Sequence, residues 1–395
     1  MVLARVILKP GHDRPVRRHH PWIFSGAIAR IEGSVEDGDI VDVWSAEREW
    51  LARGYLNRRS QIVVRLLTWD AEERIDDAFW ARRLERALAA RARLGLASVT
   101  DAYRLVFAES DWIPGLVIDR YGDFLVVQSL TLGIERRKEL LVRLLAERCR
   151  PAGIYERSDI DVREKEGLPP SEGLLWGTEP PDRIVIHEYG HRFRVDVRHG
   201  QKTGFYLDQR ENRRRAAAYL AGARVLNAFS YTGAFAVYAL AAGARHVVNL
   251  DTSADALAEA EANLALNGFS AAEQLEGDAF RVLRHLRAAG RRFDAVILDP
   301  PKFAFAQAHL ERASRGYKDI NLQALHLIES GGVLVTFSCS GLVSPDLFQK
   351  IVFAAAEDAR REVQILERLG HPADHPIRLS FPEGEYLKGL ICRVW

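Results

Sequence analysis

Apolar residues in the second half of the chain recur with two alternating periods, which predicts strands and helices in turn. Short apolar runs predict strands at 224–229, 246–250, 293–298, 332–337 and 389–395. Stretches with helical spacing separate them and predict helices at 234–242, 253–266, 320–328 and 345–361. Ser253 is expected to cap the second of these helices. This alternation is typical of a doubly wound sheet, so we expect an α/β, Rossmann-like domain over 201–395.

Residues 1–70 combine short strands with basic and aromatic side chains. Alternating runs separated by turns predict a small β barrel, with strands at 4–9, 38–43 and 60–68. Residues 1–30 are rich in arginine, including Arg17 and Arg18, and contain a single acidic residue. His20 and Trp22 lie among these basic residues. Such a mixture suits contact with RNA phosphates and bases. It suits equally well a solvated surface over core aromatic residues.

Residues 71–200 predict a central α+β domain. Amphipathic helices are expected at 75–96 and 135–148, and hairpins at 116–129 and 184–197. A stretch rich in Gly, Pro and Glu, at 163–182, predicts a loop. The chain is therefore expected to comprise three domains.

Composition narrows the class of protein. With 395 residues, 48% of them hydrophobic and 28% charged, the chain can bury real cores, and its net charge of +1 does not mark the whole chain as a polyanion binder. The three cysteines are too few and too far apart for a disulfide framework or a zinc cluster, so we expect no metal and a cytoplasmic protein. The N-terminal apolar run is too short for a signal peptide, and no run reaches membrane-spanning length, so we expect no membrane partner.

Ligands of open α/β sheets bind outside the carboxyl ends of the strands, and three of these ends carry distinctive residues. The first predicted strand leads into Asn227-Ala228-Phe229-Ser230-Tyr231-Thr232-Gly233, a turn of mostly small residues without a dinucleotide fingerprint. Asp251 ends the second strand and can accept hydrogen bonds from ribose hydroxyls. Asp278 and Ala279 follow a further strand, counted here as the third, which lies between 250 and 293; the carboxylate can accept a hydrogen bond from an adenine amino group. Any one of these residues alone could serve a cap or a turn, but their order and spacing predict an adenosyl ligand.

The fourth and fifth strand ends carry candidate catalytic residues. Asp299-Pro300-Pro301-Lys302-Phe303 is a stiff loop that fixes a carboxylate, as in loops that present a base beside a methyl donor; the alternative is a rigid turn. Cys339 follows the next strand. A thiolate that adds to carbon-6 of a pyrimidine makes carbon-5 reactive toward a methyl group, whereas a lone cysteine is more usually a small buried residue.

Two further segments resemble functional motifs. His187-Glu188-Tyr189-Gly190-His191 matches the HExxH zinc signature, but its surroundings predict strand–turn–strand, which separates the two imidazoles, so we interpret it as a decoy. The polar segment 199–213 includes Lys202, Tyr206 and Asp208. It could fold over a cofactor or serve as an interdomain linker.

On these motifs the sequence resembles the bacterial ribosomal RNA large-subunit methyltransferase I family over nearly its whole length. The segments that carry the resemblance are 18–24, 201–208, 229–233, 299–303, 338–340 and 381–390. The resemblance implies a PUA-like RNA-binding barrel, a central α+β domain and a class I methyltransferase domain that binds S-adenosyl-L-methionine. It implies methylation of carbon-5 of a cytosine in 23S ribosomal RNA. Ala234 departs from the family, whose members often have a second Gly there.

The resemblance also implies residue roles. Cys339 is the expected nucleophile and Asp299 holds the cytosine ring, assisted by Lys302. Cofactor contacts are expected from Tyr206, Asp208, Asn227, Phe229, Ser230, Tyr231, Thr232, Gly233, Asp251, Asp278, Ala279 and Asp299. RNA contacts are expected from Arg17, Arg18, His20, Trp22 and Lys202. The expected partners are 23S ribosomal RNA and a second copy in a homodimer.

Three other functions are compatible with these residues. A uracil C5 methyltransferase also needs the thiolate. Methylation of a base amino group also uses loops of the Asp-Pro-Pro type, but leaves Cys339 dispensable. A non-catalytic RNA-binding or ribosome-assembly factor could hold the cofactor as a structural ligand.

Overall fold

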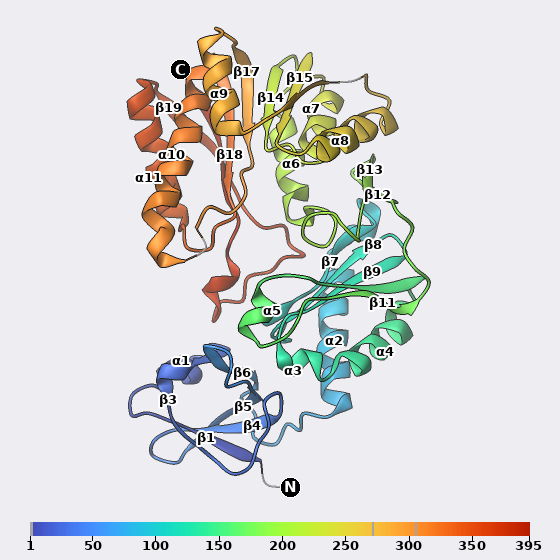
Figure 1. The fold of residues 1–395 in the computed structure, drawn as a ribbon, viewed down its shortest axis with the longest axis vertical. Coiled ribbons are helices and arrows are strands. Elements are labelled where there is room, and N and C mark those ends of the chain that lie inside the picture. Colours follow the sequence, from blue (N-terminus) through green and yellow to red (C-terminus); the bar gives the residue numbers. More distant parts are fainter. Residues whose placement is uncertain (1–2, 271, 305) are drawn as a thin grey trace. The chain divides into compact units, whose positions relative to one another are not determined.

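The structure is a computed structural model that describes residues 3–270, 272–304 and 306–395; Met1 and Val2, which begin the N-terminal apolar run, and residues 271 and 305 lie outside it. The chain forms two compact units (Figure 1). The first comprises Met1–Ile186, Val195–Leu207 and Ala373–Gly384, and the second comprises His187–Arg194, Asp208–Pro372 and Glu385–Trp395. No helix in the described part of the chain is long and apolar enough to cross a membrane.

The N-terminal part of the first unit is a six-stranded sheet with its own apolar core. Its strands, in the order β2-β6-β5-β4-β1-β3, are β1 (Ala4–Leu8), β2 (Trp22–Phe24), β3 (Ile28–Glu32), β4 (Ile40–Trp44), β5 (Trp50–Leu56) and β6 (Ile62–Thr68). Neighbouring strands run antiparallel except β1 and β4, which are parallel. A short helix, α1 (Arg14–Arg17), precedes β2. The three strands predicted from the alternating pattern are all present.

The rest of the first unit is built on a five-stranded sheet in the order β11-β10-β9-β8-β7. The strands are β7 (Ala102–Phe107), β8 (Leu116–Tyr121), β9 (Phe124–Ser129), β10 (Gly153–Ser158) and β11 (Ser171–Gly177). The helices are α2 (Asp77–Ala92), α3 (Leu132–Glu135), α4 (Lys138–Cys149) and α5 (Val162–Lys165). Buried side chains of α2 and α4 pack with those of the sheet in one apolar cluster.

The loop predicted at 163–182 is wrong in its middle, because β11 occupies it and pairs antiparallel with β10. The strand was missed because it lies at the edge of the sheet and keeps every second side chain in solvent. It also contains Gly173, which weakens a strand pattern.

Residues 373–384 are the least expected part of the first unit. They follow the sixth strand of the C-terminal sheet in sequence, yet they pack with the N-terminal and central parts of the chain. Phe381 lies against Trp22, with ring centroids 4.7 Å apart, and Glu383 accepts a hydrogen bond from His20. Arg91 donates a hydrogen bond to the backbone carbonyl of Asp374.

The second unit is a seven-stranded sheet with helices on both faces, as the alternating pattern predicts. In the order β16-β15-β14-β17-β18-β20-β19, its strands are β14 (Arg224–Ala228), β15 (His246–Asp251), β16 (Glu273–Glu276), β17 (Phe293–Leu298), β18 (Ile328–Ser338), β19 (Val363–Leu369) and β20 (Lys388–Val394). Its helices are α6 (Arg210–Ala217), α7 (Ala234–Ala241), α8 (Ala254–Leu266), α9 (Ala279–Ala288), α10 (Leu310–Leu327) and α11 (Pro345–Ala359). Strand β20 alone runs antiparallel to both of its neighbours.

One predicted helix has the expected cap, and another begins earlier than predicted. Ser253 caps α8 as predicted, accepting a hydrogen bond from the backbone N–H of Ala256 at 3.2 Å. Helix α10 begins ten residues before the predicted start at residue 320, because polar residues dominate its first turns.

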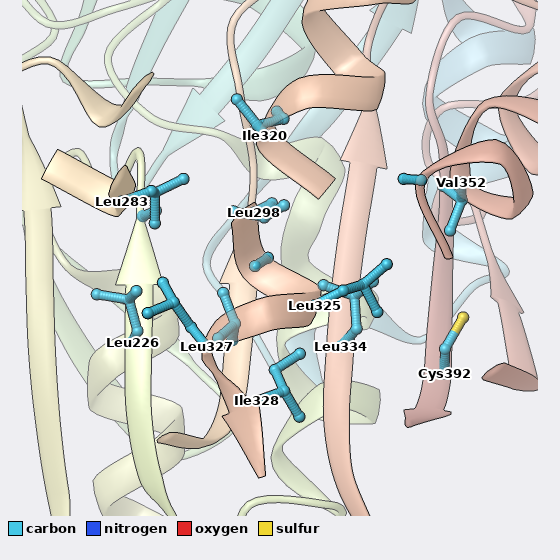
Figure 2. Close-up of a cluster of buried hydrophobic side chains, with 14 of the residues drawn as sticks. Leu226, Leu283, Leu298, Ile320, Leu325, Leu327, Ile328, Leu334, Val352 and Cys392 are labelled. Atoms are coloured by element: carbon cyan, nitrogen blue, oxygen red, sulfur yellow. The ribbon is translucent and has the colours of Figure 1, made fainter. Parts of the chain in front are cut away.

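The core of the second unit lies between the sheet and helices α9, α10 and α11. Figure 2 shows the apolar side chains that meet there, among them Leu226 of β14, Leu298 of β17 and Leu334 of β18. Cys392 of β20 points its sulfur into the same cluster and is fully buried. Burial raises the pKa of this thiol to about 12, so it is a core residue rather than a nucleophile.

The order of the strands marks where a ligand binds. From β14 the chain moves in one direction to β15 and β16, and then crosses to β17 on the other side of β14. The connections leave in opposite directions at β14 and β17, and the crevice outside the carboxyl ends of two such strands is where open α/β sheets bind ligands. The loops 229–233 and 299–303 follow these two strands.

The HExxH match lies on a hairpin, as predicted. His187 and Glu188 end β12 (Ile184–Glu188), and His191 begins β13 (His191–Val195). Tyr189 and Gly190 form the turn with φ values of 49° and 83°. Glu188 is completely buried and accepts hydrogen bonds from Arg213 at 2.9 and 2.7 Å. No group of His, Cys, Asp or Glu among the described residues could hold a metal ion.

Candidate active site

The loop after β14 has an unusual backbone. Phe229, Tyr231 and Gly233 adopt φ values of 60°, 45° and 75°, which L side chains rarely adopt. Two hydrogen bonds fasten the loop to the end of β15: the Ser230 N–H donates to the Leu250 carbonyl at 3.0 Å, and the Tyr231 N–H donates to Asp251 Oδ2 at 2.8 Å. Strained backbone held in this way is characteristic of ligand-binding sites.

Gly233 ends this loop where two helices meet. It is the N-cap residue of α7, and a Cβ at this position would lie 2.7 Å from the Cβ of Ala260 on α8. Glycine is therefore required here both by the backbone conformation and by the close approach of α8.

Two hydroxyl groups in the loop are suited to a polar ligand. Ser230 Oγ and Thr232 Oγ1 are buried, and neither has a hydrogen-bond partner among the described residues. A buried hydroxyl without a partner is unfavourable, and a ligand with amino and carboxylate groups would satisfy both. The loop therefore fits the amino-acid end of S-adenosylmethionine.

The acids predicted for the adenosyl part of the cofactor lie at the neighbouring strand ends. Asp251 accepts hydrogen bonds from the N–H groups of Tyr231 and Ser253, so its carboxylate organises the turn it belongs to. Asp278 is exposed and caps α9, accepting from the Arg281 N–H at 3.0 Å. Their contacts to a cofactor stay predictions, as do those of the buried Ala279.

Asn227 lies within β14 rather than at its end. It is buried, and its amide donates to Asn249 Oδ1 on β15 at 2.9 Å. The structure thus gives Asn227 a role in tying two strands together, and its predicted cofactor contact is not tested.

Asp208 and Asp299 are each held by residues that the sequence did not single out. Gln209 is buried; its Nε2 donates to Asp299 Oδ1 at 2.9 Å and its Oε1 accepts from Asn212 at 2.6 Å. Because both ends of the Gln209 amide are fixed, the Asp299 carboxylate is held in one orientation. Asp208, also buried, accepts a 2.6 Å hydrogen bond from the hydroxyl of Tyr386.

Tyr206 and Lys202 belong to the first unit, whereas the loop after β14 belongs to the second. The Lys202 ammonium lies 4.6 Å from the centre of the Tyr206 ring, and the Tyr206 hydroxyl donates to Gln201. Their predicted contacts, to the cofactor for Tyr206 and to RNA for Lys202, stay predictions.

Cys339 lies beside the Asp-Pro-Pro loop, as predicted. Strands β17 and β18 are parallel and pair Leu298 with Thr336, so their two ends meet at the same edge of the sheet. The Cys339 thiol is partly buried and donates a weak hydrogen bond to the Pro300 carbonyl, with sulfur and oxygen 3.8 Å apart. Lys302 is exposed in the same loop.

The Cys339 turn is fixed from both sides. Ser340 Oγ accepts from the Ala304 N–H at 3.3 Å and bonds the Tyr317 hydroxyl at 2.9 Å, which ties the turn to the Asp-Pro-Pro loop and to α10. Lys388, at the start of β20, donates to the carbonyls of Ser340 and Val343 at 2.7 and 2.6 Å.

Lys388 is a buried cation near the thiol. Burial lowers the pKa of Lys388 to about 8, and an electrostatic interaction with Cys339 partly opposes that shift. The two groups are thus close enough to interact electrostatically, and Glu385 acts on Lys388 in the same direction.

Gln209, Tyr386 and Lys388 were not predicted. Gln209 adjoins Asp208 in the polar segment, and the other two lie in the segment 381–390 that carries part of the family resemblance. Lys388 also stands out because the chain has only eight lysines, and this one begins a strand whose other residues are apolar except for Arg393.

The predicted RNA-binding residues of the N-terminal domain fall into two groups. Arg18 is exposed, whereas Arg17 forms ion pairs with Asp13 and Glu49 that raise the pKa of its guanidinium. His20 and Trp22 pack on residues 373–384, and Trp22 Nε1 donates to Glu109 at 2.8 Å. Structural packing therefore accounts for His20 and Trp22, while their RNA contacts stay predictions.

Comparison with known proteins agrees with this geometry. A family model described as S-adenosylmethionine-dependent methyltransferase matches residues 156–390, and a PUA-like domain model matches residues 6–69. The PUA-like domain expected at the N-terminus and the methyltransferase fold expected at the C-terminus are thereby confirmed. S-adenosylmethionine is the cofactor of this family.

Solved structures share the whole architecture. A methyltransferase crystallised with S-adenosylhomocysteine superposes with a TM-score of 0.86 at 23% identity, and a methyltransferase from Streptococcus mutans with a TM-score of 0.85 at 22% identity. In both comparisons, 100% of each chain is covered. At this level of identity the likeness concerns the fold.

Two relatives are much more similar in sequence. Ribosomal RNA large subunit methyltransferase I of Shewanella denitrificans is 51% identical over 394 residues, 99% of each chain. The protein of the same name from Aliivibrio fischeri is 50% identical over 98% of this chain and 99% of the relative. The chain therefore belongs to the ribosomal RNA large subunit methyltransferase I family of S-adenosylmethionine-dependent methyltransferases.

Proposed function

We propose that this protein methylates carbon-5 of a cytosine in 23S ribosomal RNA through a covalent adduct with Cys339. Support for the substrate class comes from the relatives, which are named as methyltransferases of large-subunit ribosomal RNA. One observation carries the chemistry: the Cys339 thiol adjoins the Asp-Pro-Pro loop at the edge of the sheet where the cofactor loop also lies.

The thiol is needed because carbon-5 of a pyrimidine is too weak a nucleophile to take a methyl group directly. Cys339 forms a bond to carbon-6, and the electrons of the carbon-5–carbon-6 double bond make carbon-5 nucleophilic. Asp299, oriented by Gln209, hydrogen-bonds the ring edge near N3. The cofactor supplies an electrophilic methyl group when bound.

Two bonds then break to release the product. After carbon-5 has taken the methyl group, a base removes the proton from carbon-5, and the carbon-6–sulfur bond breaks to regenerate the Cys339 thiolate. Asp299, Lys302 and water are the candidates for this base. The target base reaches the site by being flipped out of its RNA stack, as in other enzymes that modify bases.

RNA that contains 5-fluorocytidine tests this chemistry. Fluorine cannot leave carbon-5 as a proton does, so the adduct persists and the wild-type protein should migrate as a covalent complex with RNA on a denaturing gel. Cys339→Ala should form no complex and transfer no methyl group from tritiated cofactor to unmodified 23S RNA. The control is Cys149→Ala, which changes a partly buried cysteine at the end of α4.

Other outcomes identify the rival functions. An adduct with RNA containing 5-fluorouridine but none with 5-fluorocytidine would indicate uracil C5 methylation. Full methyl transfer by Cys339→Ala would remove the covalent mechanism and favour methylation of an amino group. Cofactor binding without methyl transfer by the wild type would favour a non-catalytic role.

The proposed site of action is the cytoplasm, where ribosomal RNA is modified. We also propose a homodimer, which the sedimentation of the full chain tests.

A further inference from the structure

Five side chains of the first unit form a stacked series that we call the arginine–tryptophan ladder: His19, Trp69, Arg378, Trp112 and Arg86. The rings of His19 and Trp69 are stacked, with centroids 4.8 Å apart and planes within 10° of parallel. The Arg378 guanidinium lies 5.1 Å from the centre of the Trp69 ring and 5.0 Å from that of Trp112. Arg86 lies 3.9 Å over Trp112.

The ladder joins three separate parts of the chain. His19 and Trp69 come from the N-terminal domain, Arg86 and Trp112 from the central part, and Arg378 from the segment 373–384. His19 and Trp112 both have left-handed backbone, with φ values of 62° and 58°, although neither is glycine. Backbone strain of this kind persists where the surroundings over-determine it, often at binding sites.

Arg378 is buried without an anionic partner. Only 7% of its surface is exposed, and among the described residues no carboxylate pairs with it. Its Nη2 donates to the His19 carbonyl at 2.8 Å, whereas its buried Nη1 has no hydrogen-bond partner in the described part of the chain. Burial and the nearby Arg83 and Arg86 lower the pKa of Arg378 to about 10, and the Glu109 carboxylate opposes this shift only in part.

Neighbouring arginines show that this lack is particular to the ladder. Arg91 makes two 2.6 Å bonds to Asp111, and Arg83 pairs with Glu73 at 3.2 Å. Arg86 is exposed and, within the described ranges, forms no ion pair. Both ladder arginines therefore lack an ion-pair partner among the described residues, and Arg86 is exposed to solvent.

A pocket of about 280 Å³ opens beside the ladder, and Arg86, Trp112 and Arg378 line it. Apolar side chains lie at the same pocket: Leu94 and Ile377, 40% and 38% exposed. At the other end of the ladder, His19 is exposed beside Arg18. Cationic and aromatic groups thus alternate across a partly solvated surface.

We propose that the arginine–tryptophan ladder binds a single-stranded segment of RNA, with a backbone phosphate at the pocket that Arg86 and Arg378 line and a base stacked on His19. Single-stranded nucleic acid alternates phosphates and flat bases, and proteins bind it with basic grooves and aromatic platforms. Arginine suits both partners, because its guanidinium stacks on rings and donates in a fork to phosphate. This inference rests on the proposed function, which takes RNA as the substrate.

Binding of the full-length protein to labelled, unmodified 23S RNA fragments, measured over a series of salt concentrations, tests the ladder. Arg86→Gln should flatten the slope of log affinity against log salt by about 0.7 and weaken binding about fivefold at 0.1 M salt, the loss of one phosphate contact. Arg378→Met should flatten the slope and weaken binding by similar amounts. Because Arg378 is buried, this substitution could impair folding, and the exposed Arg86→Gln then still tests the proposal. The matched control is Arg143→Gln on α4, an exposed arginine paired with Asp77.

His19→Asn separates stacking from charge. Asparagine tolerates left-handed backbone but lacks the ring, so this variant should weaken RNA binding about fivefold or more and leave the salt slope unchanged. If Arg86→Gln and His19→Asn bind RNA with the same affinity and salt slope as the wild type, the ladder assignment is overturned. Methyl transfer by the wild type would in that case still uphold the proposed function. If the wild type neither binds nor methylates the RNA, the proposed function fails and the ladder assignment fails with it.

Discussion

Gly233→Ala tests whether the loop 229–233 needs glycine for two separable reasons. The added methyl group meets a backbone with φ of 75° and would lie 2.7 Å from the Cβ of Ala260. Gly268, in the turn that follows α8, provides the matched control. Its φ is 79°, but nothing lies within 4 Å of an added Cβ. Both substitutions therefore impose the same backbone strain, and only Gly233→Ala also creates a clash.

The two effects have different magnitudes. Left-handed backbone costs an L residue about 1–2 kcal/mol, and Gly268→Ala should lower the free energy of unfolding by about that amount. Overpacking a well-filled interior adds about 1–3 kcal/mol, so Gly233→Ala should cost about 2–5 kcal/mol in total. The second substitution Ala260→Gly removes the nearest atom of the contact. The double variant should therefore recover about 1 kcal/mol or more relative to additivity.

Two measurements check this reasoning. Urea denaturation followed by circular dichroism gives the unfolding free energies, and calorimetry gives the affinity for S-adenosylhomocysteine. Gly233→Ala should bind the product at least about tenfold more weakly, which corresponds to about 1.4 kcal/mol, while Gly268→Ala binds normally. Equal unfolding free energies for Gly233→Ala and Gly268→Ala, or strict additivity in the double variant, would refute the claim that α8 excludes a side chain here.

Three further substitutions probe the buried polar groups of the second unit. Lys388→Met removes a cation whose pKa falls from 10.5 to about 8 on burial, so burial of the charged form destabilises the folded wild type below pH 8. Between pH 8 and 10.5 the folded state is neutral at Lys388 while the unfolded state is still charged, and the free energy of unfolding of the wild type should rise by up to about 3 kcal/mol relative to the variant. Parallel curves of stability against pH for the two proteins would contradict this. Tyr386→Phe removes the hydrogen bond to the buried Asp208 carboxylate and should cost about 2 kcal/mol in urea denaturation, with an unchanged midpoint as the contrary result. Glu188→Ala leaves the Arg213 guanidinium buried without its carboxylate and should cost about 3–5 kcal/mol, whereas a loss below about 1 kcal/mol would show that solvent reaches the arginine.

The methyltransferase fold was predictable because its central strands are buried on both faces. Such strands are continuous apolar runs, and β14, β15, β17 and β18 were each found within a few residues of their observed bounds. Parallel strands also place their carboxyl ends at one edge, so the loops after β14 and β17 could be expected to meet without knowledge of the structure.

The parts that could not be predicted depend on contacts between distant segments. Half-exposed β11 has an apolar run of only three residues, 174–176. The segment 373–384 has no periodicity, and its place is set by contacts such as that between His20 and Glu383, 363 residues apart. The roles of Gln209 and Lys388 could not be predicted for the same reason. These roles depend on which distant groups their polar atoms contact, and the sequence around each residue does not show those contacts.

The paired Glu188 and Arg213 have a consequence for how this protein can be divided. The carboxylate comes from the hairpin β12–β13, upstream of residue 201, and the guanidinium that it neutralises lies on α6 of the methyltransferase unit. A fragment begun at residue 201 would retain the whole seven-stranded sheet and the loops after β14, β17 and β18, yet it would bury the Arg213 guanidinium without the Glu188 carboxylate. The methyltransferase unit therefore cannot be transferred on its own. A gene fusion, or an exchange of this unit between relatives, would have to include the hairpin β12–β13.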